Sequence, residues 1–183
     1  MTFKESALKG VYIIELKPFI DNRGLFARTF CKKEFQEIGH DQEFVQFNHS
    51  VTHKKGSIRG MHYQMPPFSE IKLIRCVRGS VYDVIIDLRK DSSTFLKYTS
   101  VEITEHNMLS LYIPHGFAHG FQTLEDNTQL IYHHTAYYTP GYEAGILYND
   151  PAIGITWPLP VSVITEKDLN HSLLKKSFIG ISI

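Results

Sequence analysis

Short apolar runs alternate with turn residues along most of the chain, and this pattern predicts strands. The expected strands cover residues 58–64, 72–77, 81–88, 101–103, 108–113, 117–123 and 129–135. Short strands at this regular spacing, with Gly, Asn and Asp between them, are typical of a β-sandwich or barrel. We expect the second and third of these strands to form a hairpin that turns at Arg78-Gly79.

The N-terminal part of the chain adds fewer elements. Residues 11–16 form a further apolar run that predicts a strand, and residues 21–24 read Asp-Asn-Arg-Gly, which predicts a turn. Residues 32–38 predict a short helix, because their apolar residues share one face and Gly39 can end it.

The C-terminal part predicts one more short helix. Thr165 precedes Glu-Lys-Asp and is typical of a helix N-cap, since its hydroxyl can accept from the N–H groups that follow. We expect the proline-rich residues 151–160, which include Trp157, to wrap the barrel as an ordered loop. The chain contains no repeat or linker, so we expect one all-β domain over residues 1–183 with a few short helices.

Composition narrows the class of protein. The chain has 183 residues, of which 43% are hydrophobic and 21% charged, as in an ordinary globular domain. Lysine plus arginine equals aspartate plus glutamate, and this zero net charge disfavours a nucleic-acid polymer as partner. A small phosphorylated ligand stays open, because it needs only a few well-placed cations.

The cysteines and the apolar content predict the cellular compartment of the protein. Cys31 and Cys76 are far apart and form no CxxC pair, so we expect reduced thiols in a cytoplasmic protein. The first ten residues contain no apolar segment of a secretory signal. No run is long and apolar enough to cross a bilayer, so we expect no membrane partner.

Strand alternation brings candidate chemical groups to common faces. The expected faces are Ile58, Gly60, His62 and Gln64; Lys72, Ile74 and Cys76; His119 and Phe121; and Thr128, Leu130, Tyr132 and His134. Each set mixes apolar residues with a cationic or proton-transfer group. Facing into a barrel, they would form the mostly apolar pocket that is typical of a small-ligand site. Among the other histidines, we expect His53, His106 and His171 at the surface.

Each candidate also has a purely structural interpretation. Tyr132 alone is typical of a core tyrosine with a satisfied hydroxyl. Lys72 alone is typical of a solvated strand residue, and Asp168 alone of a carboxylate in the first turn of a helix. The combination of these residues, and not any one of them, favours a catalytic site.

A metal site is the main alternative. Metal-binding barrels of the cupin type use His-x-His, a later Glu and a further His, and this chain offers His62, Glu70 and His119. Gln64 stands in place of the second histidine, and borderline divalent metals favour imidazole over a neutral amide oxygen. We therefore expect no metal. The chain has no dinucleotide or P-loop fingerprint, so we also expect no cofactor.

Proton transfer remains as the chemistry of these groups. His62 can act as a general base near neutral pH, and Asp168 can fix its tautomer. Tyr132 can return a proton from another strand, while Lys72 can stabilise an oxyanion between the two steps. Together these groups suit removal and return of a proton next to a carbonyl, which gives an epimer when the two steps use opposite faces.

The motifs resemble those of one family over residues 10–168. The matching segments are Asp21-Asn22-Arg23-Gly24-Leu25-Phe26, Gln46-Phe47-Asn48, Arg59-Gly60-Met61-His62-Tyr63-Gln64, Tyr82-Asp83-Val84, Asp87-Leu88-Arg89, residues 113–121, Tyr137-Tyr138 and Asn149-Asp150-Pro151. The chain is similar to the dTDP-4-dehydrorhamnose 3,5-epimerases, cupin-fold enzymes that epimerise 4-keto-6-deoxy nucleotide sugars. The resemblance implies a cupin-type jelly-roll barrel, a nucleotide-diphosphate 4-keto-6-deoxy sugar as substrate and no cofactor. It also implies a homodimer in which the N-terminal segment reaches the neighbouring subunit.

The resemblance further implies roles for individual residues. His62 would be the general base, paired with Asp168. Tyr132 would be the opposing acid, and Lys72 would stabilise the enolate. The residues that would bind substrate are Arg23, Phe26, Arg28, Gln46, Asn48, Arg59, His119, Tyr138, Glu143 and Lys167.

Three residues depart from the expected pattern. Arg28 stands where the rhamnose-pathway enzymes usually carry Glu, and we hypothesise that this reversed charge tunes substrate choice. His133 stands where a lysine is common. Arg59 has the wrong strand parity to lie beside His62, which a bulge at Gly60 or a role across the subunit interface would resolve. A single-carbon epimerase or a ketoisomerase on the same scaffold is the nearest alternative function.

Overall fold

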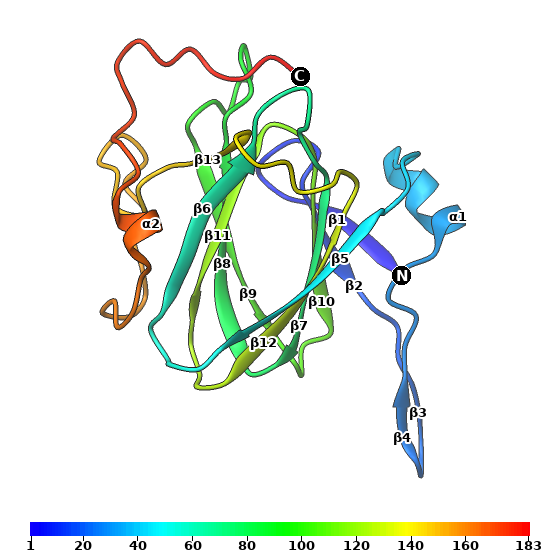
Figure 1. The fold of residues 1–183 in the computed structure, drawn as a ribbon. Coiled ribbons are helices and arrows are strands. Elements are labelled where there is room, and N and C mark those ends of the chain that lie inside the picture. Colours follow the sequence, from blue (N-terminus) through cyan, green and yellow to red (C-terminus); the bar gives the residue numbers. More distant parts are fainter.

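The computed structural model describes residues 1–183 and contains two β-sheets that face each other (Figure 1). The six-stranded sheet has the order β1 (Thr2–Glu5), β2 (Tyr12–Glu15), β10 (Leu109–Ile113), β7 (Lys72–Arg78), β12 (Thr128–His134) and β5 (Gln46–Thr52). The five-stranded sheet has the order β13 (Glu143–Gly145), β6 (Ile58–Gln64), β11 (Phe117–Thr123), β8 (Ser80–Asp87) and β9 (Tyr98–Thr104). Neighbouring strands within both sheets are antiparallel. This architecture confirms the predicted all-β jelly-roll barrel.

The apolar core fills the space between β10 and β7 of one sheet and β11, β8 and β9 of the other. Its buried members include Ile74, Cys76, Ile85, Ile103, Leu111, Phe121 and Leu130. Toward β5 and β13 the side chains between the sheets become polar, so that Leu130 is followed on its face of β12 by Tyr132 and His134. One side of the barrel therefore supplies the buried apolar surface that stabilises the fold, and the other side holds a cavity.

β7 and β8 do not pair, so the predicted hairpin at Arg78-Gly79 is wrong. β7 lies between β10 and β12, whereas β8 lies between β11 and β9 in the opposite sheet. Gly79 has a φ of +73°, and a Cβ there would lie 2.6 Å from Oγ1 of Thr128. The glycine lets the chain turn sharply from one sheet into the other. Apolar alternation cannot distinguish the two connections, because both strands face the core in either case.

A β-bulge interrupts β6 at Gly60. Two residues of β6 between Arg59 and His62 oppose Gly120 alone on β11. Gly60 has a φ of +120°, and a Cβ there would lie 2.6 Å from the Cα of Gly120. The extra residue reverses the alternation, so Arg59 and His62 line the same cavity. The predicted face that joined Gly60 to His62 is therefore wrong, and the bulge accounts for the parity of Arg59.

The chain after β13 covers the outer face of the five-stranded sheet, as the orange and red segment of Figure 1 shows. Residues 146, 153 and 157 pack there against Met61, Val84 and Ala118, which confirms the predicted wrapping loop. The hydroxyl of Thr165 accepts from the N–H of Asp168 at 3.2 Å and caps α2 (Glu166–Leu169), as predicted. No helix of the structure is long and apolar enough to cross a membrane.

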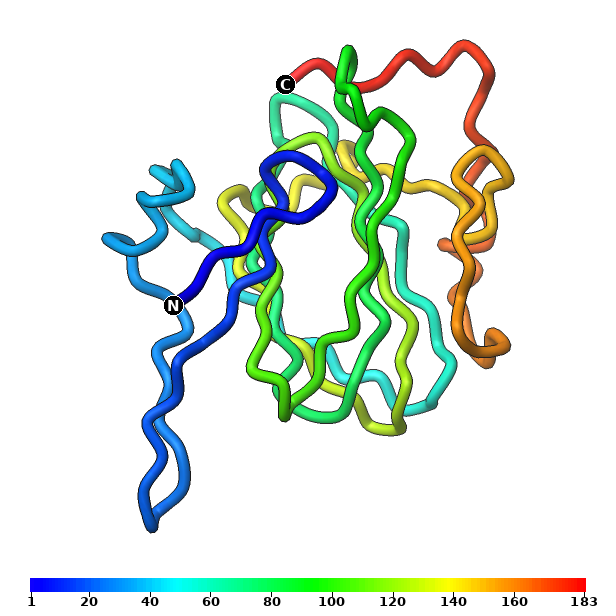
Figure 2. Tube along the Cα trace, turned by 180° about the vertical axis from the view of Figure 1, so that it is seen from behind, coloured from blue at the N-terminus to red at the C-terminus, as the bar shows by residue number.

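A separate hairpin projects away from the barrel (Figures 1 and 2). It consists of β3 (Phe19–Asp21) and β4 (Gly24–Phe26), with the predicted turn at its tip. The side chains of Phe19, Ile20, Leu25 and Phe26 are all largely exposed, with exposed fractions of 59% to 78%. The predicted helix follows as α1 (Lys32–Phe35) and a 3-10 turn at Gln36–Ile38, which Gly39 ends with a φ of +78°.

Candidate active site

A cavity of about 630 Å³ opens between β5, β7 and β12 of one sheet and β6, β11 and β13 of the other. This volume lies within the range of pockets that bind small molecules. The predicted site residues that line it are Gln46, Asn48, Arg59, His62, Lys72, His119, Tyr132, Tyr138, Glu143, Lys167 and Asp168. The predicted residues Arg23, Phe26 and Arg28 do not line it.

His62 and Asp168 form a hydrogen-bonded pair on the wall made by β6. Nε2 of His62 lies 2.7 Å from Oδ1 of Asp168, whose Oδ2 accepts from the N–H of Gly60 at 3.2 Å. The His62 side chain is 43% exposed and the Asp168 side chain only 4%. Burial alone would raise the pKa of Asp168, but the hydrogen bonds from His62 and Gly60 lower it below its usual value. The ionised carboxylate fixes the tautomer of the imidazole and leaves Nδ1 available as a base.

Tyr132 and Lys72 reach the cavity from the opposite sheet. Burial and the Asp83 carboxylate raise the pKa of Tyr132, so its hydroxyl keeps a proton that it can donate at neutral pH. Nζ of Lys72 donates to the backbone carbonyl of His62 at 3.1 Å and forms an ion pair with Glu70 at 3.2 Å. An ammonium held between the two walls can stabilise an oxyanion that forms there.

His119 is engaged by a second carboxylate. Its Nε2 lies 2.9 Å from both carboxylate oxygens of Asp83, and both side chains are buried. Burial lowers the pKa of His119 and raises that of Asp83. The pairing leaves Nδ1 as the ring nitrogen of His119 that remains for other contacts.

The sequence suggested a possible metal site made of His62, Glu70 and His119. In the structure each of these side chains is already engaged by another residue. The two oxygens of Glu70 contact Nζ of Lys72 at 3.2 Å and Nδ1 of His134 at 2.7 Å. His62 and His119 each direct Nε2 to a carboxylate of their own. His134 thereby becomes a site residue that the sequence placed on the correct strand face but to which it gave no role.

His171 belongs to the site, so its predicted surface position is wrong. Its side chain is 15% exposed, and its buried Nε2 has no hydrogen-bond partner and lies 3.9 Å from Oδ1 of Asp168. The ring packs against Gly145, where a Cβ would collide with it. His62, Asp168 and His171 bring ligand atoms within 4.8 Å of one another, as a metal would require. The hydrogen bond between His62 and Asp168 already satisfies two of these three groups.

Three predicted residues lie together at the exposed edge of the cavity. Nζ of Lys167 contacts Oε1 of Glu143 at 3.0 Å. A hydrogen bond to Glu143 raises the pKa of Tyr138. Arg59 also lines the cavity, and its Nε donates to Oγ1 of Thr52 at 2.9 Å. The cavity therefore offers two cations, Lys167 and Arg59, and the aromatic ring of Tyr138, groups that bind phosphates and flat bases.

The three predicted residues that do not line the cavity all belong to the N-terminal segment. Arg23 lies at the tip of the β3–β4 hairpin, where its side chain is 86% exposed and pairs with Asp21 at 2.6 Å. Arg28 pairs with Glu34 at 2.6 Å, and Glu34 also binds the N-terminal ammonium at 2.6 Å.

We expect Glu70 to make the free energy of unfolding depend on pH in the acid range. Burial alone would raise its pKa, but Lys72 and His134 lower the pKa from 4.5 to about 2. Because the folded-state pKa is depressed, this contribution is fully present above pH 4.5 and is lost as the pH falls toward 2. A shift of this size corresponds to about 3 kcal/mol at most.

Urea unfolding at a series of pH values measures this effect. The free energy of unfolding should fall more steeply for the wild type than for Glu70→Gln across this pH range. Glu37→Gln, at an exposed position of the 3-10 turn, serves as the control and should follow the wild type. Equal pH dependence of wild type and Glu70→Gln would contradict the prediction.

Comparison with known proteins agrees with this geometry. The family model for dTDP-4-dehydrorhamnose 3,5-epimerase matches residues 5–176. The chain is 43% identical over 171 residues to the dTDP-4-dehydrorhamnose 3,5-epimerase of Shigella flexneri, an alignment that covers 93% of this chain and 94% of that one.

Solved structures give the same result. The dTDP-4-dehydrorhamnose 3,5-epimerase of Bacillus anthracis, with TDP and PPi bound, superposes with a TM-score of 0.92 at 37% identity, covering 94% of this chain and 99% of that chain. The dTDP-6-deoxy-D-glucose-3,5-epimerase of Legionella pneumophila, in complex with dTDP-4-keto-L-rhamnose, also has a TM-score of 0.92, at 35% identity, covering 100% of this chain and 98% of that chain. Sequence and fold thus agree over nearly the whole chain, and the protein belongs to the dTDP-4-dehydrorhamnose 3,5-epimerase family of cupin-type isomerases.

Proposed function

We propose that the cavity epimerises a nucleotide-diphosphate 4-keto-6-deoxy sugar by removing and returning a proton next to the ketone, without a cofactor. The observation that carries this proposal is the position of His62, whose ring is exposed in the cavity while its partner Asp168 is buried. Tyr132 and Lys72 belong to the facing sheet. The base and the acid therefore reach a bound sugar from different walls, as inversion of a carbon requires.

In the proposed reaction, Nδ1 of His62 takes the proton, and Asp168 stabilises the imidazolium that forms. The electron pair left on the carbon forms an enolate, whose oxygen the ammonium of Lys72 stabilises. Removing one such electrostatic contact typically costs about 10²–10³-fold in rate. Tyr132 then donates a proton to the opposite face of the carbon, and the carbonyl forms again. The imidazolium of His62 then loses a proton to solvent and the phenolate of Tyr132 regains one, which restores both groups.

The relatives support a dTDP-linked sugar as the substrate. The Bacillus anthracis structure contains TDP, and the Legionella pneumophila structure contains dTDP-4-keto-L-rhamnose. At the cavity edge, the exposed Lys167 and Tyr138 suit a diphosphate and a nucleotide base. We infer that the nucleotide occupies the edge and the sugar the interior, with C3 and C5 on either side of the C4 ketone.

We expect the wild type to introduce deuterium from D2O at C3, C5 or both of dTDP-4-keto-6-deoxyglucose, as proton NMR would record. His62→Ala should slow this exchange by about 10²–10⁴-fold, because it removes the base. Tyr132→Phe should retain exchange but lose inversion, because only the acid is removed.

His106→Ala is the matched control for this experiment, since His106 is exposed in the turn after β9 and does not line the cavity. Exchange should also persist in a metal chelator, whereas a metal-dependent cupin enzyme would lose it. Absence of exchange with every 4-keto nucleotide sugar tested would reject the proposed function.

We further propose a homodimer in which the β3–β4 hairpin reaches the cavity of the neighbouring chain. The hairpin projects from the barrel (Figure 2). Its apolar side chains Phe19, Ile20, Leu25 and Phe26 are largely exposed. Exposed apolar patches of this kind mark protein contacts. The six-stranded sheet adds exposed Phe47, Val51 and Val77. In such a dimer, Arg23 and Phe26 would complete the cavity of the neighbouring chain, which accounts for their distance from their own.

Combining two impaired variants in one dimer tests whether the hairpin of one chain completes the cavity of the other. We expect His62→Ala and Arg23→Ala each to have little activity as homodimers. Co-expression should restore about a quarter of the wild-type activity, because half of randomly paired dimers are mixed and each contains one intact cavity. If co-expression restored no activity, the hairpin would not complete the neighbouring cavity. A monomer in sedimentation analysis would contradict the dimer.

We also propose that Arg28 tunes substrate choice from this N-terminal segment. Its side chain is 63% exposed and its guanidinium is paired with Glu34, so it can contact a neighbouring chain. Arg28→Glu should change the ratio of turnover among dTDP-, CDP- and GDP-linked 4-keto sugars by about fivefold or more. Lys33→Glu, an equal change of charge at an exposed position of α1, should leave the ratio as it is. An unchanged preference in Arg28→Glu would contradict the proposal.

A further inference from the structure

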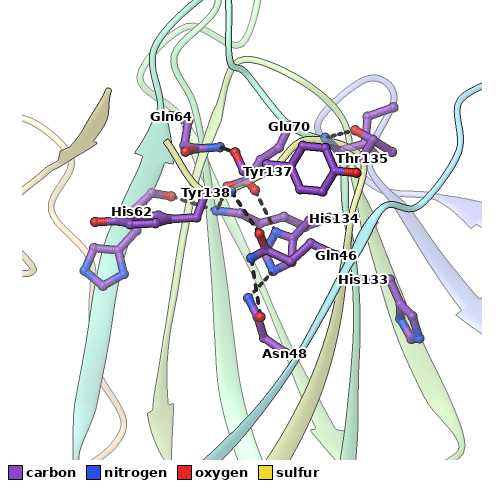
Figure 3. Close-up of polar contacts among 12 residues, drawn as sticks. Gln46, Asn48, His62, Gln64, Glu70, His133, His134, Thr135, Tyr137 and Tyr138 are labelled. Atoms are coloured by element: carbon purple, nitrogen blue, oxygen red, sulfur yellow. Dashed lines mark hydrogen bonds and ion pairs between the residues drawn. The ribbon is translucent and has the colours of Figure 1, made fainter. Parts of the chain in front are cut away.

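A continuous chain of hydrogen bonds links the inner wall of the cavity to its edge (Figure 3). Its members, in order, are Lys72, Glu70, His134, Asn48, Gln46 and the backbone N–H of Tyr138. At the inner end, Oε1 of Glu70 contacts Nζ of Lys72 at 3.2 Å, and Oε2 of Glu70 accepts from Nδ1 of His134 at 2.7 Å. Lys72 is held at the same time by the carbonyl of His62 at 3.1 Å.

The outer half of the chain runs along β5. Nε2 of His134 lies 3.2 Å from Nδ2 of Asn48, and Oδ1 of Asn48 accepts from Nε2 of Gln46 at 3.3 Å. Oε1 of Gln46 then accepts from the N–H of Tyr138 at 2.9 Å. Each side-chain amide therefore uses one end to accept and the other to donate.

The two ends of the chain determine the direction of every bond in it. The backbone N–H of Tyr138 can only donate, so Gln46 must present its oxygen there and its amino group to Asn48. The ionised Glu70 can only accept, so His134 must carry its proton on Nδ1. Nε2 of His134 is then an acceptor, as the amino group of Asn48 requires. From Tyr138 to Glu70 all the donors point from the edge toward the interior, and the ammonium of Lys72 donates to Glu70 from the other side.

Residues 137–139, which lie at the cavity edge, are hydrogen-bonded to both sheets. Gln46 on β5 binds Tyr138, while Gln64 on β6 binds the residues on either side of it. Oε1 of Gln64 accepts from the N–H of Thr139 at 2.8 Å, and its Nε2 donates to the carbonyl of Tyr137 at 3.3 Å. The position of the Tyr138 ring at the cavity edge therefore depends on amide groups that lie between the sheets.

We propose that Gln46, Asn48 and His134 form a positioning relay that fixes Tyr138 at the nucleotide end and Lys72 at the sugar end of the cavity. The inference rests on the proposed function for what the two ends bind. It assigns His134 a role in the site. It also adds a positioning role to Gln46 and Asn48, which line the cavity and use one donor and one acceptor each in the relay. Loss of His134 would leave Asn48 without the acceptor of its amino group and the largely buried Glu70 with Lys72 alone.

The protonation pattern of His134 tests the relay without any substrate. Nitrogen-15 NMR of the unliganded protein should show His134 protonated at Nδ1 and bare at Nε2, with the signal assigned by its loss in His134→Phe. In Asn48→Asp both ring nitrogens should be protonated, because a carboxylate in that position accepts where the amide donates. A proton on Nε2 of His134 in the wild type would overturn the proposed direction of the bonds.

Binding of dTDP tests the link to the edge. His134→Phe should weaken dTDP binding, measured by calorimetry, by about fivefold to tenfold in the wild-type background. The same substitution should change dTDP affinity by less than about twofold when Tyr138→Ala is already present, because its effect passes through that ring. Equal losses in both backgrounds, or no loss in the first, would overturn the relay. His106→Phe, in the exposed turn after β9, is the matched control.

A further variant and a rate measurement complete the test. Gln46→Leu breaks the chain at its outer link and should reproduce the loss of dTDP affinity if His134→Phe does not fold. His134→Phe should also lower kcat by about tenfold with or without Tyr138→Ala, because Lys72 loses its position in both backgrounds. An unchanged kcat would show that the relay does not position Lys72. The NMR and dTDP measurements need no turnover, so they separate a failure of the relay from a failure of the proposed reaction.

Discussion

A charged group that lies between two packed sheets needs a partner, and the whole site depends on how this protein meets that constraint. Three carboxylates, two that line the cavity and one buried behind its wall, each form a hydrogen bond with one histidine. The pairs are His62 with Asp168, His119 with Asp83, and His134 with Glu70. Each pair fixes which ring nitrogen of the histidine stays available for proton transfer or for contact with substrate. The contacts that stabilise the buried groups therefore also determine which chemical groups the cavity walls present.

The backbone meets a related constraint at Gly60. Its close approach to Gly120 leaves no room for a side chain, and the bulge turns both Arg59 and His62 into the cavity. The N–H of Gly60 is directed to Asp168. A single distortion of β6 therefore places the base, a cation and one of the donors that hold the carboxylate. The fold and the site are not separable at this point of the chain.

Local pattern predicted the strands that carry most of the site, and it failed where the environment of a strand is unusual. β5 was absent from the predicted strands because its alternation is reversed. Gln46, Asn48 and Ser50 line the cavity, whereas Phe47 and Val51 are exposed. The jelly-roll crossing after β7 was predicted as a hairpin, since both topologies bury the same alternate residues. In each case the pattern records which face is apolar, but not what lies opposite it.

The sequence by itself determined the strand-rich architecture, the family and the kinds of chemical group in the site, because these follow from residue identity and from alternation within a few neighbours. Only the tertiary structure decided which groups meet. His62 and Asp168 lie 106 residues apart in the chain, and Glu70 and His134 lie 64 apart. Their contact depends on strand register, on the bulge at Gly60 and on the course of the chain after β13. These are properties of the packed sheets, and no local segment encodes them.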